Sequence, residues 1–217
     1  MFYITFSGCS NLSGEIPENL FAGISGAPAV GMFSSTFYNC EKLSGEIPGN
    51  LFGEFDGAPA NSMFSGTFSG CSNLSGEIPE NLFSGITGDP ATSMFASTFR
   101  GCNNLSGSIP GNLFAGIKGA PAYRMFHNTF YNCSNLSGEI PEKLFGEFDG
   151  APAESMFDGT FYKCSNLTGI GAGLFEGIDT NSDYVERMFA YTFYNCSNLT
   201  GPSAKIGDKY LYEIWSP

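Results

Sequence analysis

Glutamate residues at a fixed interval are the clearest candidates for chemistry in this sequence. Glu15, Glu46 and Glu77 are 31 residues apart, Ser108 stands at the next position of the series, and Glu139 resumes it. Ca²⁺ takes carboxylate oxygens, and a row of carboxylates also attracts a basic protein surface. An ordinary solvated edge of an acidic protein is the favoured interpretation of the same row. We treat these five positions as the candidate binding face, with Ca²⁺ as one candidate ligand.

Catalytic chemistry is not indicated by the remaining polar residues. The acidic residues recur at repeat positions, without the single cluster that general acid and base catalysis by paired carboxylates needs. His127 is the only histidine, and it stands where other units have Ser34, Ser65 or Ala96. We expect it at the surface, and it has no recurring partner for a catalytic triad. The sequence therefore predicts a protein that is not an enzyme.

Cysteine also recurs once in each unit, and two interpretations are open. Stacked units would bring equivalent Cα atoms within disulfide range. An odd number of cysteines at constant spacing favours a buried row of free thiols, because cysteine is a small and often buried apolar residue. A metal site is poorly supported, since there is no CxxC motif and only one histidine. The seven positions are 9, 40, 71, 102, 133, 164 and 196.

Two further rows of polar residues have both a functional and a structural interpretation. Six Asn-Leu-Ser/Thr triplets are formal glycosylation sequons, but an asparagine between two elements more simply satisfies backbone groups of a turn. The row from Thr5 to Thr192 is similar to the threonine ladders of ice-binding proteins, whereas hydrogen bonding to the preceding turn is the favoured role. The triplets begin at Asn11, Asn73, Asn104, Asn135, Asn166 and Asn198.

The element that positions these rows is a tandem repeat. The seven methionines stand at 1, 32, 63, 94, 125, 156 and 188, so the period is 31 residues and once 32. A fixed period of this length is typical of repeat architectures in which each unit packs against its neighbours. We predict one domain over 1–217, with units that start near the methionines and a C-terminal cap at about 200–217. Because Met1 is already in phase, the chain is expected to be a segment of a longer protein.

Each unit is predicted to contain one helix and one strand. In the fourth unit, Ala91, Met94, Phe95, Thr98, Phe99 and Cys102 follow the spacing of one helical face. The alternation of Leu105, Gly107 and Ile109 with serine is typical of a half-buried strand, and Leu113, Phe114 and Ile117 are expected to point inward. The predicted fold class is an α/β solenoid, with one short parallel strand and one helix per unit.

The charge of the chain excludes some partners. The formal net charge is −12, and the nine Lys and Arg residues form no run. Nucleic-acid binding relies on basic residues that neutralise phosphates, so a nucleic-acid partner is not expected. An anionic membrane surface is disfavoured for the same reason, and no apolar run approaches the length of about 20 residues that spans a membrane.

The units SNLSGEIPENLF and MFSGTFSGCSNL resemble the BspA-like leucine-rich repeats of bacterial surface proteins from the mouth and gut. This resemblance implies a right-handed array like the leucine-rich repeats. It also implies a cell-surface or secreted scaffold that mediates adhesion by binding proteins or glycans. The alternative is a structural spacer that projects another domain, and an ice-binding or cation-binding array is a remoter one. The units vary most just before each methionine, as at Thr92-Ser93 and Tyr123-Arg124. This variation favours binding over the spacer.

Overall fold

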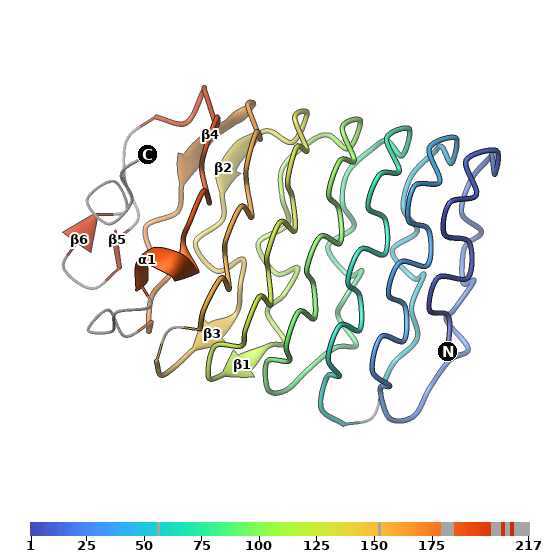
Figure 1. Ribbon diagram of the computed structural model, residues 1–217, viewed down its shortest axis with the longest axis horizontal. Coiled ribbons are helices and arrows are strands. Elements are labelled where there is room, and N and C mark those ends of the chain that lie inside the picture. The colour runs from blue at the N-terminus through green and yellow to red at the C-terminus, as the bar shows by residue number, and fades with distance from the viewer. Residues whose placement is uncertain (56, 152, 179–184, 201–204, 207–208, 211–217) are drawn as a thin grey trace.

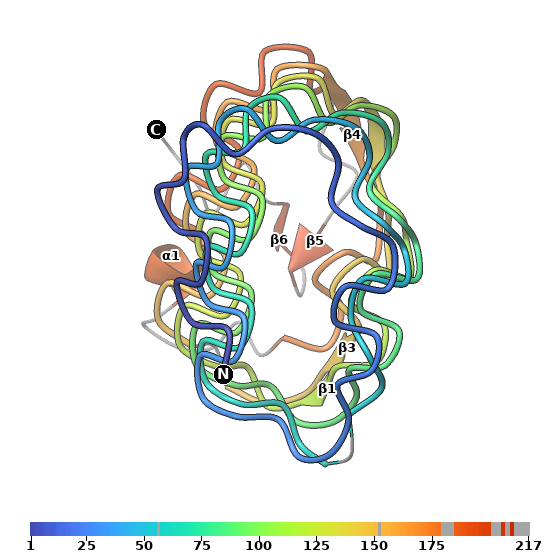
Figure 2. The same ribbon diagram turned by 90° about the vertical axis from the view of Figure 1, so that its right-hand side faces the viewer.

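The protein is a row of stacked coils, one for each sequence repeat. In the computed structural model, the coils follow one another along the longest axis from the N-terminus to the C-terminus (Figure 1). The structure describes residues 1–55, 57–151, 153–178, 185–200, 205–206 and 209–210. Viewed down the stack, each coil is a closed, elongated loop that superimposes on its neighbours (Figure 2). Equivalent residues of successive units therefore lie beside each other.

Regular elements are short. Strands β1 (Lys118–Gly119) and β3 (Glu147–Phe148) pair in parallel, as do β2 (Gly138–Ile140) and β4 (Leu167–Ile170). Strands β5 (Lys205–Ile206) and β6 (Lys209–Tyr210) pair antiparallel. Elsewhere neighbouring coils are joined by isolated parallel bridges, for example Gly76 with Leu105. Helix α1 (Val185–Met188) is the only helix in the described part of the chain.

The predicted α/β solenoid with one helix and one strand per unit is wrong. Residues 91–102, expected as a helix, form consecutive turns. The backbone N–H of Met94 donates to Ala91 O and that of Thr98 to Phe95 O, both over three residues rather than four. The strand expected at Leu105, Gly107 and Ile109 is reduced to single bridges at Leu105 and Gly107. The leucine-rich-repeat architecture that rested on these elements is overturned with them.

Turns replace the helix because every fourth residue has a left-handed backbone. In the fourth unit φ is 54° at Ser93, 57° at Ser97 and 75° at Gly101. A positive φ at the third residue of a four-residue turn is the geometry of a type II turn, which favours Gly and Asn. A four-residue repeat of turns places apolar residues at nearly the spacing of a helix with 3.6 residues per turn. The two structures therefore share a hydrophobic pattern.

The backbone N–H groups that form no hydrogen bond within a turn connect neighbouring coils. Between the turn bonds, the N–H groups of Phe95, Ser97 and Phe99 donate to carbonyls of the next coil over 2.8 to 2.9 Å. Local turn bonds and bonds between coils thus alternate along the segment and satisfy the buried backbone groups. We call this segment the turn row. Its residues are 1–9, 29–40, 60–71, 91–102, 122–133, 153–164 and 188–196.

Ladders of phenylalanine fill the interior of the stack. Each coil places one ring from Met-Phe, one from Thr-Phe and, in six units, one from Leu-Phe on the equivalent ring of the next coil. Phe64 and Phe95 are stacked with centroids 5.6 Å apart, and Phe68 and Phe99 are 5.8 Å apart. The inward orientation predicted for Leu113, Phe114 and Ile117 is confirmed, since each is about 1% exposed.

Threonine and cysteine form two polar ladders inside this core. Thr98 Oγ1 donates to Phe95 O at 2.8 Å and to Phe64 O in the preceding coil at 3.0 Å. The predicted hydrogen bond to the preceding turn is confirmed, although the residue lies in a turn and not in a helix. Cys102 Sγ donates to Phe68 O at 3.1 Å. The buried thiol row is also confirmed from Cys40 to Cys196, whereas Cys9 is exposed, and all seven are free thiols.

The C-terminal cap predicted at about 200–217 lies mostly outside the described residues. Within it, the β5 and β6 pair lies inside the outline of the coils when the stack is viewed end-on (Figure 2). The pair stands at the C-terminal end of the stack (Figure 1).

Candidate binding groove

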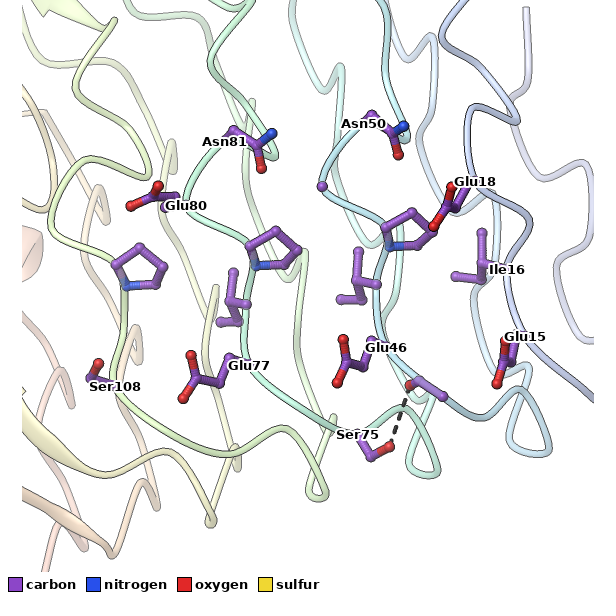
Figure 3. Close-up of a pocket in the computed structure, with 17 residues that line it drawn as sticks. Glu15, Ile16, Glu18, Glu46, Asn50, Ser75, Glu77, Glu80, Asn81 and Ser108 are labelled. Carbon is purple, nitrogen blue, oxygen red and sulfur yellow. Dashed lines mark hydrogen bonds between the residues drawn. The ribbon is translucent and has the colours of Figure 1, made fainter.

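The predicted glutamate row forms one edge of a groove across successive coils. Glu15, Glu46, Glu77 and Ser108 are exposed and follow one another in register from coil to coil (Figure 3). They line a hollow of about 1060 Å³. Glu139 is exposed at the equivalent position in β2, where it pairs with Gly169 of β4, but it does not line the hollow. The structure thus brings four of the five predicted residues together.

The opposite edge of the groove consists of residues that the sequence analysis did not select. Glu18 and Glu80 stand three residues after the first row, and Asn50 and Asn81 point to the same side (Figure 3). The floor between the edges is apolar and is built from Ile16, Ile47, Ile78, Pro48, Pro79 and Pro110. We call the hollow between the two edges the acidic groove.

Glycines of the next coil allow the glutamate side chains to lie flat along the stack. A Cβ atom at Gly45 would lie 2.7 Å from Glu15 Cγ, and one at Gly76 would lie 2.7 Å from Glu46 Cγ. Real Cβ atoms do not approach so closely, so an added Cβ would displace the glutamate side chain from this position. Both glycines also have φ of +76°, which L-residues rarely adopt. The recurrence of Gly before Glu in SGEIP was the sequence signal for this packing.

The groove is rich in hydrogen-bond acceptors and contains no positive charge. Five carboxylates line it, from Glu15, Glu18, Glu46, Glu77 and Glu80, and none of its lining residues is basic. The amide of Asn50 donates to Asn19 Oδ1 at 2.7 Å, which aligns the amides along the stack. Such a surface suits a ligand with cationic or hydrogen-bond donor groups.

A calcium site does not emerge from this geometry. In the described part of the chain, no group of three or more His, Cys, Asp or Glu side chains is close enough to hold a metal ion. Calcium takes six to eight oxygen ligands, so a row of single carboxylates provides too few around one point. Ca²⁺ stays a prediction from the sequence, without a coordination group to support it.

His127 lies in the turn row, away from the acidic groove. It is half-buried rather than at the surface as expected, and its Nδ1 is 3.6 Å from Asp158 Oδ2. Burial lowers the pKa of His127, while the carboxylate of Asp158 opposes that shift. Asn128 Nδ2 lies 2.9 Å from His127 Nε2. Among the described residues, these side-chain contacts of His127 involve an aspartate and an asparagine.

The asparagines of the Asn-Leu-Ser/Thr triplets do not cap turns with their side chains. The side chains of Asn73, Asn104, Asn135, Asn166 and Asn198 are exposed, and in the described chain they neither donate to nor accept from a backbone group. Asn11 Oδ1 accepts a hydrogen bond from Lys42 Nζ at 2.7 Å. The expectation that these amides satisfy turn backbone groups is therefore wrong.

Two further observations bear on the class of protein. Among the described residues, no helix has both the length and the apolar character needed to cross a membrane. Comparison of the chain with protein-family models, with curated proteins and with solved structures finds no match.

Proposed function

We propose that this protein is a non-enzymatic binding scaffold, displayed on a cell surface or secreted, that holds a protein or glycan ligand in the acidic groove. The observation that carries the proposal is the groove itself, which crosses four coils between two edges rich in acceptors. The likeness of the units to BspA-like repeats supports display outside the cell. The charge of the groove favours a basic polypeptide segment as the ligand.

Electrostatics explains why a basic ligand would bind along this groove. Equivalent side chains of paired parallel strands are about 4.8 Å apart, so neighbouring glutamates repel by roughly 1 kcal/mol or less in a water-like dielectric. A ligand whose cationic groups follow the row relieves this repulsion and gains attraction. The net charge of −12 also steers basic ligands toward the protein.

Removing two groove carboxylates is expected to weaken binding of a basic peptide. The variant Glu46→Ser/Glu77→Ser introduces the residue that Ser108 already supplies at the equivalent position, so the fold should tolerate it. Exposed ion pairs contribute about 0.2–1 kcal/mol each, which predicts roughly a two- to thirtyfold rise in Kd for a labelled octalysine peptide. Fluorescence anisotropy at low ionic strength measures this change. The converse variant, Ser108→Glu, should lower Kd.

The matched control removes two carboxylates outside the groove. Glu41 and Glu176 are exposed and do not line the hollow. If Glu41→Ser/Glu176→Ser weakens octalysine binding as much as the groove variant does, net charge and not the groove determines binding. If the parent protein does not bind octalysine, the ligand proposed for the groove is wrong. The alternative function, a structural spacer supported by the uniform ring ladders, would then be favoured.

A further inference from the structure

A second surface, chemically unlike the acidic groove, lies on the turn row of the C-terminal half. Tyr131, Tyr162 and Tyr194 occupy the same position in consecutive coils and are stacked, with centroids 4.5 and 5.1 Å apart. The guanidinium of Arg100 covers the free face of Tyr131 at 4.9 Å from the ring centroid. Tyr191 meets Tyr194 edge-on at 6.0 Å. One continuous column of aromatic and cationic groups results.

Basic groups surround this column. Lys163 Nζ lies 5.5 Å from the ring centroid of Tyr162. Arg124 is close enough to His127 and Asp158 to affect the pKa of both side chains. Two acidic groups lie nearby: Asp158 Oδ2 is 3.6 Å from His127 Nδ1, and Glu154 is 3.8 Å from Arg187. We call Arg100, Arg124, Tyr131, Tyr162, Lys163 and Tyr194 the tyrosine patch.

The tyrosine patch and the acidic groove face opposite sides of the stack. Helix α1 leads into the last turn row, whereas β2 carries Glu139 of the glutamate row. Viewed end-on, α1 and β4, the strand that pairs with β2, lie on opposite sides of the coil outline (Figure 2). The two surfaces can therefore hold separate partners at the same time.

Folding does not require the residues of the patch. In the preceding coil, the position of Arg100 and Tyr131 is occupied by Ser69, and that of Lys163 by Gly70. Ser93 stands one coil before Arg124 at the equivalent position. These coils form the same turns and the same bonds between coils. The large and charged residues are thus additions to a turn row that is complete without them.

The geometry points to the tyrosine patch as a docking surface for an acidic segment of a protein partner. Tyrosine and arginine are enriched in protein interfaces and dominate their binding energy. Arginine binds carboxylates through paired hydrogen bonds. A glycan is disfavoured, because sugar rings would need free aromatic faces, and the faces of Tyr131 and Tyr162 are covered by neighbouring rings and by Arg100. The tyrosine patch thus suits an acidic partner, whereas the acidic groove suits a basic one.

The test uses variants that copy residues already present in the repeats. In Arg100→Ser/Arg124→Ser/Tyr131→Ser, each position takes the serine found in an equivalent coil, so the midpoint of thermal unfolding should change by only a few degrees. The probe is a labelled octaglutamate peptide, titrated by fluorescence anisotropy at low ionic strength. We expect the parent to bind it and the triple variant to bind about tenfold more weakly. Added salt should weaken binding by the parent.

The controls distinguish this proposal from the proposed function of the groove. The groove variant Glu46→Ser/Glu77→Ser should bind octaglutamate as well as the parent does or better. Failure of the parent to bind octaglutamate, or equal binding by the triple variant, overturns the docking surface and leaves the groove untouched. Tighter binding of an oligogalacturonate, lost in the triple variant, would overturn the protein partner in favour of an anionic glycan.

Discussion

Replacing Phe99 with aspartate is expected to abolish cooperative unfolding of the central coils. Phe99 is fully buried and stacked between Phe68 and Phe130 at centroid distances of 5.8 and 5.6 Å. Loss of a buried phenylalanine costs about 3–5 kcal/mol, and an unpaired buried charge adds several more. The sum approaches the total stability of most domains, about 5–15 kcal/mol. Thermal melting and limited proteolysis measure the effect.

Two controls distinguish the effect of a buried charge on stability from the effect of an added charge alone. Asn104→Asp introduces the same charge at an exposed position of the same coil and should change stability by less than about 0.5 kcal/mol. Phe99→Leu keeps an apolar side chain and should fold with a lower midpoint. An unchanged melting curve for Phe99→Asp would show that the ring is not in the core.

The second large effect is expected from alkaline pH, because the folded protein holds its thiols protonated. Burial raises the pKa of Cys71 and Cys196 to about 12, and it raises the pKa of Cys102, Cys133 and Cys164 well above the ordinary value of 9.0. Above pH 9 the unfolded chain loses thiol protons that the folded chain keeps. Stability is therefore complete below pH 9 and falls as pH rises from about 9 toward 12.

The size of this alkaline effect can be measured for one thiol. Between pH 8.5 and 10.5, a thiol that ionises only in the unfolded state removes about 2 kcal/mol from the free energy of unfolding. Urea unfolding in reductant should show that Cys102→Ala loses about 2 kcal/mol less than the parent over this interval. The comparison cancels the contributions of lysine and tyrosine. Equal losses in both proteins would mean that Cys102 is not held as a buried thiol.

The sequence predicted which residues face inward because burial depends on spacing, and the spacing recurs in every unit. Leu113, Phe114 and the cysteines were identified in this way. The same spacing led to a wrong helix, since a four-residue turn and a helical turn bury nearly the same positions. The distinguishing signal was the small residue at every fourth position, as in Ser62, Gly66 and Gly70. Glycine twice within ten residues is unfavourable inside a helix.

The binding surfaces were predictable only in part. The glutamate row followed from the period alone, but the opposite edge with Glu18 and Glu80 depends on how the chain bends after the proline. The variable residues before each methionine pointed to Arg124, which lies in the tyrosine patch. The patch itself joins different residue types from four coils, so only the stacking of coils shows that Arg100 and Tyr131 are neighbours.

Both surfaces require that the turn row keeps successive coils in register. The variant Gly66→Ala tests the turn row most directly. Gly66 has φ of +64°, and an added Cβ would lie no closer than 3.3 Å to its nearest neighbour, Ser35 Oγ. The change in stability on Gly66→Ala therefore depends on the backbone conformation and not on steric crowding. The turn row predicts that alanine destabilises the protein by about 1–2 kcal/mol in urea unfolding, because alanine disfavours the left-handed region. Stabilisation by about 1 kcal/mol, the value for glycine to alanine inside a helix, would contradict the turn row.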